Sequence, residues 1–165
     1  MDATASERSW QEAVEFCWNP PVAVVGVGNR LRGDDAVGPA IVDRLCGHCP
    51  FPCFDGGTAP ENLAAPLCRC GPRTILLVDA VHFGVDPGGI RLFASRKLAE
   101  VDVSTHAASP GLLIEYLQER TGAEVYLLGV QPLRCAFGEA MSGPCRAAVS
   151  EVAQLLANTG VRSRG

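Results

Sequence analysis

The fold of this chain is decided by the stretch Val22-Ala-Val-Val-Gly-Val-Gly-Asn-Arg-Leu-Arg-Gly-Asp-Asp-Ala-Val-Gly38. It opens with an apolar run that lacks polar alternation, which is typical of a strand buried on both faces. A glycine turn follows, and then two adjacent acids, Asp34 and Asp35, appear just before a predicted helix. This order places carboxylates at the carboxyl edge of a sheet, where open α/β folds bind their ligands.

Strand and helix patterns alternate along the rest of the chain. Strands are predicted at 22–27, 51–54, 74–78, 89–94 and 124–130, and helices at 35–46, 60–69, 110–120 and 142–157. Pro39 places the start of the first of these helices near Asp34 or Asp35. The helix at 110–120 is expected to bury Leu113, Tyr116 and Leu117. The alternation predicts an α/β fold, a three-layer αβα sandwich around a mostly parallel, twisted sheet.

The length of 165 residues predicts a single main domain. Ser9 and Glu12 have the spacing of a capping box, so a short helix is expected before Asn19-Pro20-Pro21 ends it. We therefore expect a helical appendage at 1–20, one α/β domain at 21–160 and a tail at 161–165.

Composition narrows the range of partners. The chain has 14 basic and 18 acidic residues and a formal charge of -4, with no basic cluster, so nucleic acid is not an expected partner. No apolar run approaches the roughly 18 residues of a membrane span, and the first residues do not resemble a signal peptide. A cytoplasmic protein without membrane contact is expected, with its eight cysteines mostly reduced.

Acids stand at the ends of three predicted strands: Asp34 and Asp35, then Asp55, then Asp79. Asp79 lies between apolar residues and must be at least partly buried, so it needs a hydrogen-bonding, charged or metal partner. His106 lies in a polar loop before a helix. Two carboxylates and an imidazole would suit a divalent ion with positions left open for substrate. For each residue alone, capping a helix or turn, or simple solvation, is the plainer explanation.

Two other classes of site fit less well. Gly26-Val-Gly28 resembles the start of a dinucleotide-binding fingerprint, but Leu31 stands where the third glycine belongs. The protease signatures His-Glu-x-x-His and Gly-x-Ser-x-Gly are absent.

The cysteines leave a further alternative open. Cys46-Gly-His-Cys49, Cys53 and Cys68-Arg-Cys70 have spacings close to those of metal ligands. Cys-x-Cys is tight for zinc, and the first pair comes at the end of a helix rather than on a knuckle. Buried or half-exposed thiols are the favoured interpretation, with structural zinc or a redox pair as the alternatives.

Six short motifs follow one another between residue 22 and about residue 157. They are Gly26-Val-Gly-Asn29-x-Leu31-x-x-Asp34-Asp35-x-x-Gly38, Asp55-Gly-Gly-Thr-Ala-Pro-Glu-Asn62, Leu77-Val-Asp79-Ala80, Pro87-Gly-Gly89, Ser104-Thr-His106 and Leu128-Gly-Val-Gln-Pro132. In order and spacing they resemble the nickel–iron hydrogenase maturation endopeptidases. The second and last motifs look most like the branch that processes the large subunit of energy-type, formate-linked hydrogenases.

The resemblance implies an α/β endopeptidase that removes a C-terminal extension from a hydrogenase large-subunit precursor after nickel insertion. It also implies that Asp35, Asp79 and His106 contact the metal and carry the reaction. The nickel is supplied by the substrate, and no tightly bound cofactor is expected in the enzyme. Asp34 is expected to cap the helix. The alternative on the same scaffold is a non-catalytic assembly factor that binds nickel or the partner.

Overall fold

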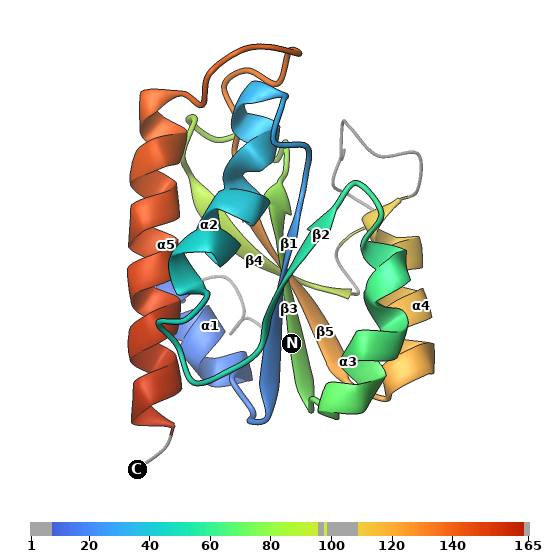
Figure 1. Ribbon diagram of the computed structural model, residues 1–165. Helices are drawn as coiled ribbons and strands as arrows, with labels where there is room; N and C mark the ends of the chain where they lie inside the picture. Colours follow the sequence, from blue (N-terminus) through green and yellow to red (C-terminus); the bar gives the residue numbers. More distant parts are fainter. Residues whose placement is uncertain (1–7, 96–97, 99–108, 164–165) are drawn as a thin grey trace, which may run out of the picture.

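One five-stranded sheet organises the protein, and the strands lie in the order β2-β1-β3-β5-β4 (Figure 1). The structure is a computed structural model that describes residues 8–95, 98 and 109–163. The strands are β1 (Val22–Val27), β2 (Cys53–Gly57), β3 (Thr74–Ala80), β4 (Ile90–Ala94) and β5 (Glu124–Val130). The pairs β1–β2, β1–β3 and β3–β5 are parallel, and β4 runs antiparallel to β5. The predicted mostly parallel sheet is confirmed.

Helices cover both faces of the sheet, as the alternating pattern predicts. They are α1 (Trp10–Cys17), α2 (Val37–Leu45), α3 (Ala64–Cys70), α4 (Pro110–Thr121) and α5 (Gly143–Arg162), with short 3-10 turns η1 (Gly33–Ala36) and η2 (Pro60–Leu63). Figure 1 shows α1, α2 and α5 on one face, with α3 and α4 on the other. The three-layer α/β fold is therefore confirmed. No helix in the described part of the chain is both long and apolar enough to span a membrane.

Alternate residues of the central strands enter two separate cores. One core lies under α2 and α5, and the other lies under α3 and α4. Every residue of β1 and β3 is buried, because each of these strands is covered on both faces. The buried sheet side chains of the first core are Val22, Val24, Leu76, Val78, Ala80, Leu128 and Val130, and those of the second are Ala23, Val25, Val27, Ile75, Leu77, Phe93, Val125 and Leu127.

Two glycines allow α2 to pack directly on the sheet. A Cβ atom added at Gly38 would collide with the carbonyl oxygens of Val27 and Val78, and one at Gly26 would collide with the carbonyl of Gly38. The start of α2 is therefore held against the carboxyl ends of β1 and β3. This contact sets the position of the η1 turn that precedes α2.

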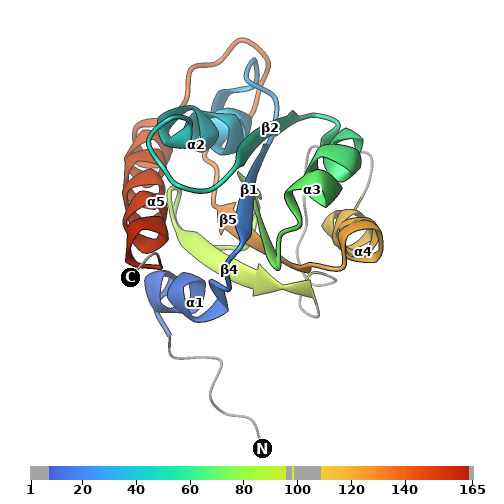
Figure 2. The same cartoon turned by 60° about the horizontal axis from the view of Figure 1, so that its bottom comes forward.

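The N-terminal helix packs into the same structure. The predicted capping box is confirmed, because the Glu12 backbone N–H donates to Ser9 Oγ at 3.3 Å and the Ser9 backbone N–H donates to Glu12 Oε2 at 3.0 Å. Val14 is fully buried in the core that α5 also enters. Figure 2 shows α1 beside β4 and near the C-terminal end of α5.

Several predicted boundaries shift by a few residues. The predicted start of the second helix is a 3-10 turn, and regular α-helix begins at Val37. The third strand continues to Ala80, which places Asp79 inside it. In α4 the expected burial of Tyr116 is wrong: its side chain is 38% exposed, while Ile114 and Leu117 are fully buried. These two residues are three apart and share one face of the helix, so Tyr116 is turned toward solvent.

Candidate active site

The strand order reverses between β1 and β3, because β2 lies on one side of β1 and β3 on the other. In open α/β sheets the crevice at such a reversal, beyond the carboxyl ends of the strands, is the usual ligand site. Asp35 lies in η1, shortly after β1, and Asp79 is the penultimate residue of β3. The topology therefore places these two predicted site residues on either side of the reversal.

Asp35 is held by the loop that follows β1. Asp35 is only 1% exposed, and its Oδ2 accepts a hydrogen bond of 2.9 Å from the Asn29 backbone N–H. The Asn29 side chain in turn accepts from the Leu31 N–H at 2.9 Å. Gly28 has a φ of +142°, and a Cβ atom there would collide with the Asp35 carbonyl oxygen. Glycine is thus required for this loop to approach the helix start closely.

Asp79 is buried, and it lies near enough to Asp35 to be affected by its negative charge. It is 5% exposed, and its Oδ1 accepts a hydrogen bond of 2.8 Å from the Ala80 N–H. Burial and then the negative charge of Asp35 raise the pKa of Asp79 well above the usual value for aspartate. A buried carboxyl group that is affected by the charge of a second one favours either a retained proton or a bound cation, and a buried acid with a perturbed pKa is a candidate for a functional site.

Asp34 does not cap the helix, and that expectation is wrong. It is fully buried and accepts four hydrogen bonds from a segment about one hundred residues later in the chain. The donors are the backbone N–H groups of Leu133 (2.8 Å), Arg134 (3.0 Å) and Ser142 (2.7 Å) and the hydroxyl of Ser142 (2.9 Å). Burial acts to raise the pKa of Asp34, but these bonds outweigh it and the pKa is lowered. Asp34 therefore fixes the loop after β5 beside Asp35.

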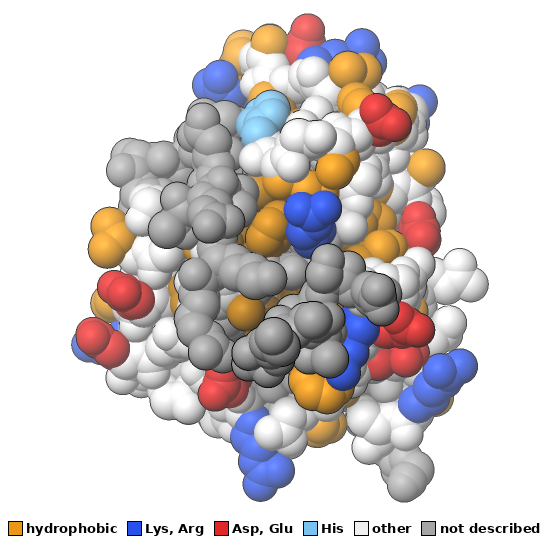
Figure 3. All heavy atoms as spheres, turned by 180° about the vertical axis from the view of Figure 1, so that it is seen from behind, with side chains coloured by type: hydrophobic (Ala, Val, Ile, Leu, Met, Phe, Trp, Pro, Cys, Tyr) orange, Lys and Arg blue, Asp and Glu red, His pale blue; other side chains and the backbone are white. Residues whose placement is uncertain are grey.

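Exposed apolar side chains lie on the two loops that Asp34 joins. Leu31, Leu133 and Phe137 are 61%, 56% and 73% exposed. The Gly138 N–H donates to the Leu31 carbonyl at 2.8 Å, so the two loops are directly bonded. Figure 3 shows hydrophobic side chains beside Lys or Arg side chains at the end of the molecule where these loops lie in Figure 1.

Asp55, the other strand-end acid, has a different environment. It is exposed, and its Oδ2 lies 2.7 Å from Nη2 of Arg30, which also pairs with Asp43 at 2.6 Å. Its other oxygen accepts from the Gly57 N–H at 2.9 Å. Asp55 and Arg30 thus join the end of β2 to the loop after β1. They support the site rather than add a third buried carboxylate.

Gln131 and His82 are polar groups at this edge that sequence reasoning missed. Gln131 is 8% exposed, and its Oε1 accepts from the Phe83 N–H at 2.8 Å. Its Nε2 lies 3.3 Å from Nδ1 of the exposed His82. Gln131 belongs to the motif Leu128-Gly-Val-Gln-Pro132, but the motif alone does not indicate its role. For His82 the available signal was position alone, because it follows Asp79 by three residues.

His106 lies outside the described residues, so its predicted role stays a prediction. Among the residues that are described, no three His, Cys, Asp or Glu side chains are placed to hold a metal ion. All eight cysteines are free thiols. The zinc alternative therefore has no ligand cluster in the described part of the chain.

A hollow of about 500 Å³ lies elsewhere, between α2 and α5. It is lined by Asp43, Arg44, His48, Ser150, Ala153, Gln154 and Ala157. Its lining includes neither Asp35 nor Asp79. The carboxylate pair at the reversal of strand order remains the candidate active site.

Comparisons with known proteins agree with this fold and indicate its family. Residues 41–159 match the family model described as HycI, hydrogenase maturation protease. The hydrogenase 3 maturation protease of Escherichia coli (strain K12) is 37% identical over 134 residues, which cover 79% of this chain and 85% of that protein. The crystal structure of a nickel–iron hydrogenase maturation protease HycI from Thermococcus kodakarensis KOD1 matches with a TM-score of 0.81 and 28% identity, over 89% of this chain and 97% of that one. The solution structure of an endopeptidase HycI from Escherichia coli matches with a TM-score of 0.73 and 34% identity, over 81% and 86%.

These likenesses extend over most of the sheet and its covering helices. The fold is that of hydrogenase maturation endopeptidases. The chain belongs to the HycI-type hydrogenase maturation protease family.

Proposed function

We propose that this endopeptidase removes the C-terminal extension of a nickel–iron hydrogenase large-subunit precursor after nickel has been inserted. In this proposal Asp35, Asp79 and His106 contact the nickel that the precursor carries. The observation that supports it most directly is the buried pair of carboxyl groups at the carboxyl ends of β1 and β3. The name of the Escherichia coli relative, hydrogenase 3 maturation protease, supports the choice of substrate class.

The electrostatics of the pair favour a cation that arrives with the substrate. Since burial and Asp35 raise the pKa of Asp79, Asp79 holds a proton more tightly than an exposed aspartate does. A divalent ion near both carboxyl groups reverses this preference and releases the proton. Carboxylate and imidazole ligands suit nickel, so a precursor with its metal seated would be bound better than an unloaded one.

Peptide hydrolysis needs groups that move protons to and from the reacting atoms. Carboxyl groups at Asp35 and Asp79 can perform this task when the scissile peptide lies over the strand ends. Asp34 and Gly38 act indirectly, because they hold the turn that carries Asp35. This assigns the chemistry to Asp35, Asp79 and His106, and the supporting geometry to their neighbours.

A protein substrate also needs a docking surface near the reacting groups. The exposed Leu31, Leu133 and Phe137 lie on loops that are joined through Asp34, the residue next to Asp35. Exposed apolar side chains that adjoin a polar site are typical of protein interaction surfaces. We assign this surface to the body of the large-subunit precursor.

The test is a cleavage assay with purified large-subunit precursor, with and without nickel. The expected result is the loss of a C-terminal peptide by mass spectrometry, seen only with the nickel-loaded precursor. Asp79→Asn and His106→Ala should leave the precursor uncut, while Asp43→Asn, a change at an exposed carboxylate, should cut normally.

Other outcomes would contradict the proposal in distinct ways. Cleavage without nickel would show that the three residues do not recognise the metal. Binding of a verified nickel-loaded precursor without cleavage would favour the non-catalytic assembly factor.

A further inference from the structure

Two cysteines, Cys46 and Cys49, lie on the connection between α2 and β2, and a third, Cys53, begins β2 at the opposite end of the strand from the candidate active site. The Sγ atoms of Cys49 and Cys53 are 3.4 Å apart. Both thiols also point to the same acceptor, the Phe51 carbonyl oxygen, at 3.3 Å and 3.7 Å. Both residues are half-buried, so the pair is accessible from solvent. Nothing in the proposed peptidase chemistry uses these thiols.

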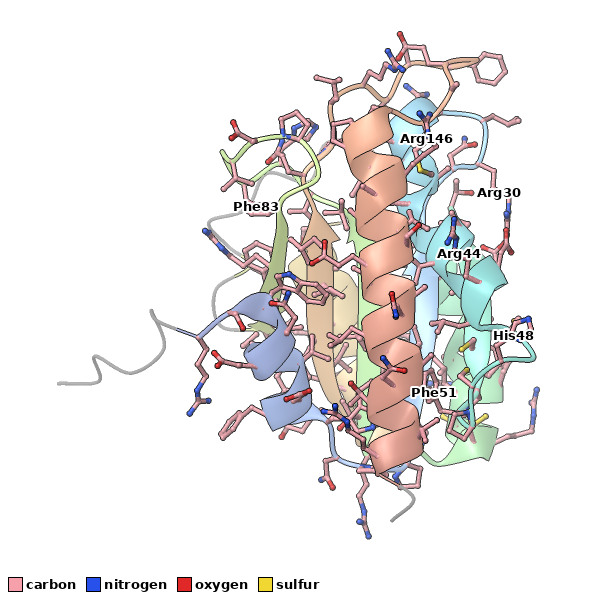
Figure 4. All side chains as sticks on the ribbon, turned by 90° about the vertical axis from the view of Figure 1, so that its left-hand side faces the viewer. Arg30, Arg44, His48, Phe51, Phe83 and Arg146 are labelled. Atoms are coloured by element: carbon pink, nitrogen blue, oxygen red, sulfur yellow. The ribbon has the colours of Figure 1, made fainter. Side chains whose placement is uncertain are left out.

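The connection is held in place by its neighbours. The ring of Phe51 packs edge-on against Trp18, with centroids 5.1 Å apart, and it fills the space that a side chain at Gly160 would need. Cys53 is the first residue of β2 and pairs in register with Val24 of β1. Figure 4 shows His48 and Phe51 on this connection, with sulfur atoms beside them. The two thiols are therefore brought together by packing as well as by their short separation in sequence.

We propose that Cys49 and Cys53 form a reversible modification site, which low-molecular-weight disulfides such as oxidised glutathione convert to an intramolecular disulfide. The two sulfur atoms need to approach by about 1.4 Å to reach bonding distance, which is within reach of side-chain rotation. A metal site is the less suitable use of these thiols, because no third His, Cys, Asp or Glu among the described residues completes a ligand set.

The reaction proceeds by two thiol–disulfide exchanges. The Cys49 thiolate attacks one sulfur of the reagent, which forms a mixed disulfide and releases one glutathione thiolate. Cys53 then loses its proton to solvent, attacks the Cys49 sulfur and releases the second glutathione thiolate. The protein gives up two electrons and two protons, and the reagent disulfide becomes two thiols.

The order of attack follows from the environment of Cys53. Burial, and then the hydrogen bond and charge of Cys49, raise the pKa of Cys53, so its thiol is the weaker first nucleophile. Once Cys49 is part of a mixed disulfide, its charge no longer opposes ionisation of Cys53. The second exchange then has its nucleophile already in contact with the sulfur that it attacks.

The experiment uses the full-length protein, reduced and then treated anaerobically with oxidised glutathione before alkylation. The expected product has lost two hydrogen atoms, has no glutathione attached at Cys49 or Cys53, and gives a Cys49–Cys53 cross-linked peptide on mapping. Dithiothreitol should restore both thiols.

Cysteine-to-serine variants distinguish a Cys49–Cys53 disulfide from reactions of the other thiols. Cys46→Ser and the double variant Cys68→Ser/Cys70→Ser should form the same disulfide, because Cys46, Cys68 and Cys70 are exposed and lie outside the pair. Cys53→Ser should instead stop at a stable mixed disulfide on Cys49. Either of two results with the protein that carries no substitution would overturn the proposal. They are a cross-link that maps to Cys46, and alkylation of both Cys49 and Cys53 after treatment with oxidised glutathione.

Discussion

Asp34→Asn is expected to destabilise the protein strongly, although it replaces only one carboxylate oxygen with an NH2 group. Asp34 Oδ2 accepts from the Leu133 and Arg134 N–H groups and from the Ser142 hydroxyl, while Oδ1 accepts from the Ser142 N–H. An amide has only one oxygen, so in either orientation its NH2 group faces at least one N–H donor. The better orientation keeps the three bonds to the remaining oxygen and sacrifices the bond to the Ser142 N–H.

The magnitude follows from this count of bonds. A buried N–H left without an acceptor costs about 1–3 kcal/mol. The three bonds that remain lose their charged acceptor, and each becomes weaker by roughly 1 kcal/mol. The free energy of unfolding should therefore fall by about 4–6 kcal/mol, a large part of the ~5–15 kcal/mol that stabilises a typical domain.

Urea unfolding at pH 7 measures this loss directly, with Asp43→Asn as the matched control. Asp43 is exposed and pairs with Arg30, so its replacement should cost at most about 1 kcal/mol. The difference should also depend on pH. Because the folded-state pKa of Asp34 is lowered, its contribution is complete above the pKa of the unfolded chain and is lost as pH falls through the lowered value. The difference in the free energy of unfolding between the original protein and Asp34→Asn should therefore become smaller in acid.

Two results would refute this reasoning. Equal stabilities of Asp34→Asn and Asp43→Asn at pH 7 would mean that the four bonds contribute little. A gap that stays constant on acidification would mean that the charge of Asp34 is not what holds the loop.

Three further changes test other parts of the site. Asp79→Asn should abolish cleavage yet raise the free energy of unfolding measured by urea titration at pH 7. The pKa of Asp79 is raised in the folded protein, so its contribution to stability is present at low pH and is lost as pH rises through the folded-state value. If the variant still cuts the precursor, Asp79 takes no part in the reaction. Gly38→Ala should lower the free energy of unfolding by about 1–3 kcal/mol, since its Cβ would push α2 off the strand carbonyls, and an unchanged urea midpoint would contradict that packing. Phe137→Ser should raise KM for the precursor several-fold while kcat and Tm stay unchanged, and a fall in kcat alone would place Phe137 in the chemistry instead.

The fold was largely predictable because its signals are local. The apolar runs at Val22–Val27 and Ile75–Val78 are uninterrupted because both strands are covered on two faces. Boundaries were less predictable where capping or packing decides them, as with the 3-10 turn before Val37. The face of α4 was misjudged because Tyr116 is apolar enough to fit the pattern yet stacks near Arg120 at the surface.

The site was predictable only where topology alone determines it. The strand-end acids could be brought to one edge from the sequence because the carboxyl ends of parallel strands lie together, but the choice of Asp35 and Asp79 among them came from the family resemblance. The role of Asp34 could not be predicted, because its partners lie 99 to 108 residues away and carry no local pattern. Asp55 matched the same strand-end rule, but the Arg30 guanidinium draws it into an exposed ion pair.

The hydrogen bonds between Asp34 and residues far along the chain also bear on when the protein can become active during its synthesis. Chains emerge from the ribosome N-terminus first, and contacts between distant segments form late because loop closure must come before them. The Asp34 carboxylate has none of these four partners until Ser142 has been made. A nascent chain that carries both Asp35 and Asp79 thus still lacks the hydrogen bonds that support the turn of Asp35. With the role proposed for Asp35, a chain that has not yet reached Ser142 is not a partly active protease.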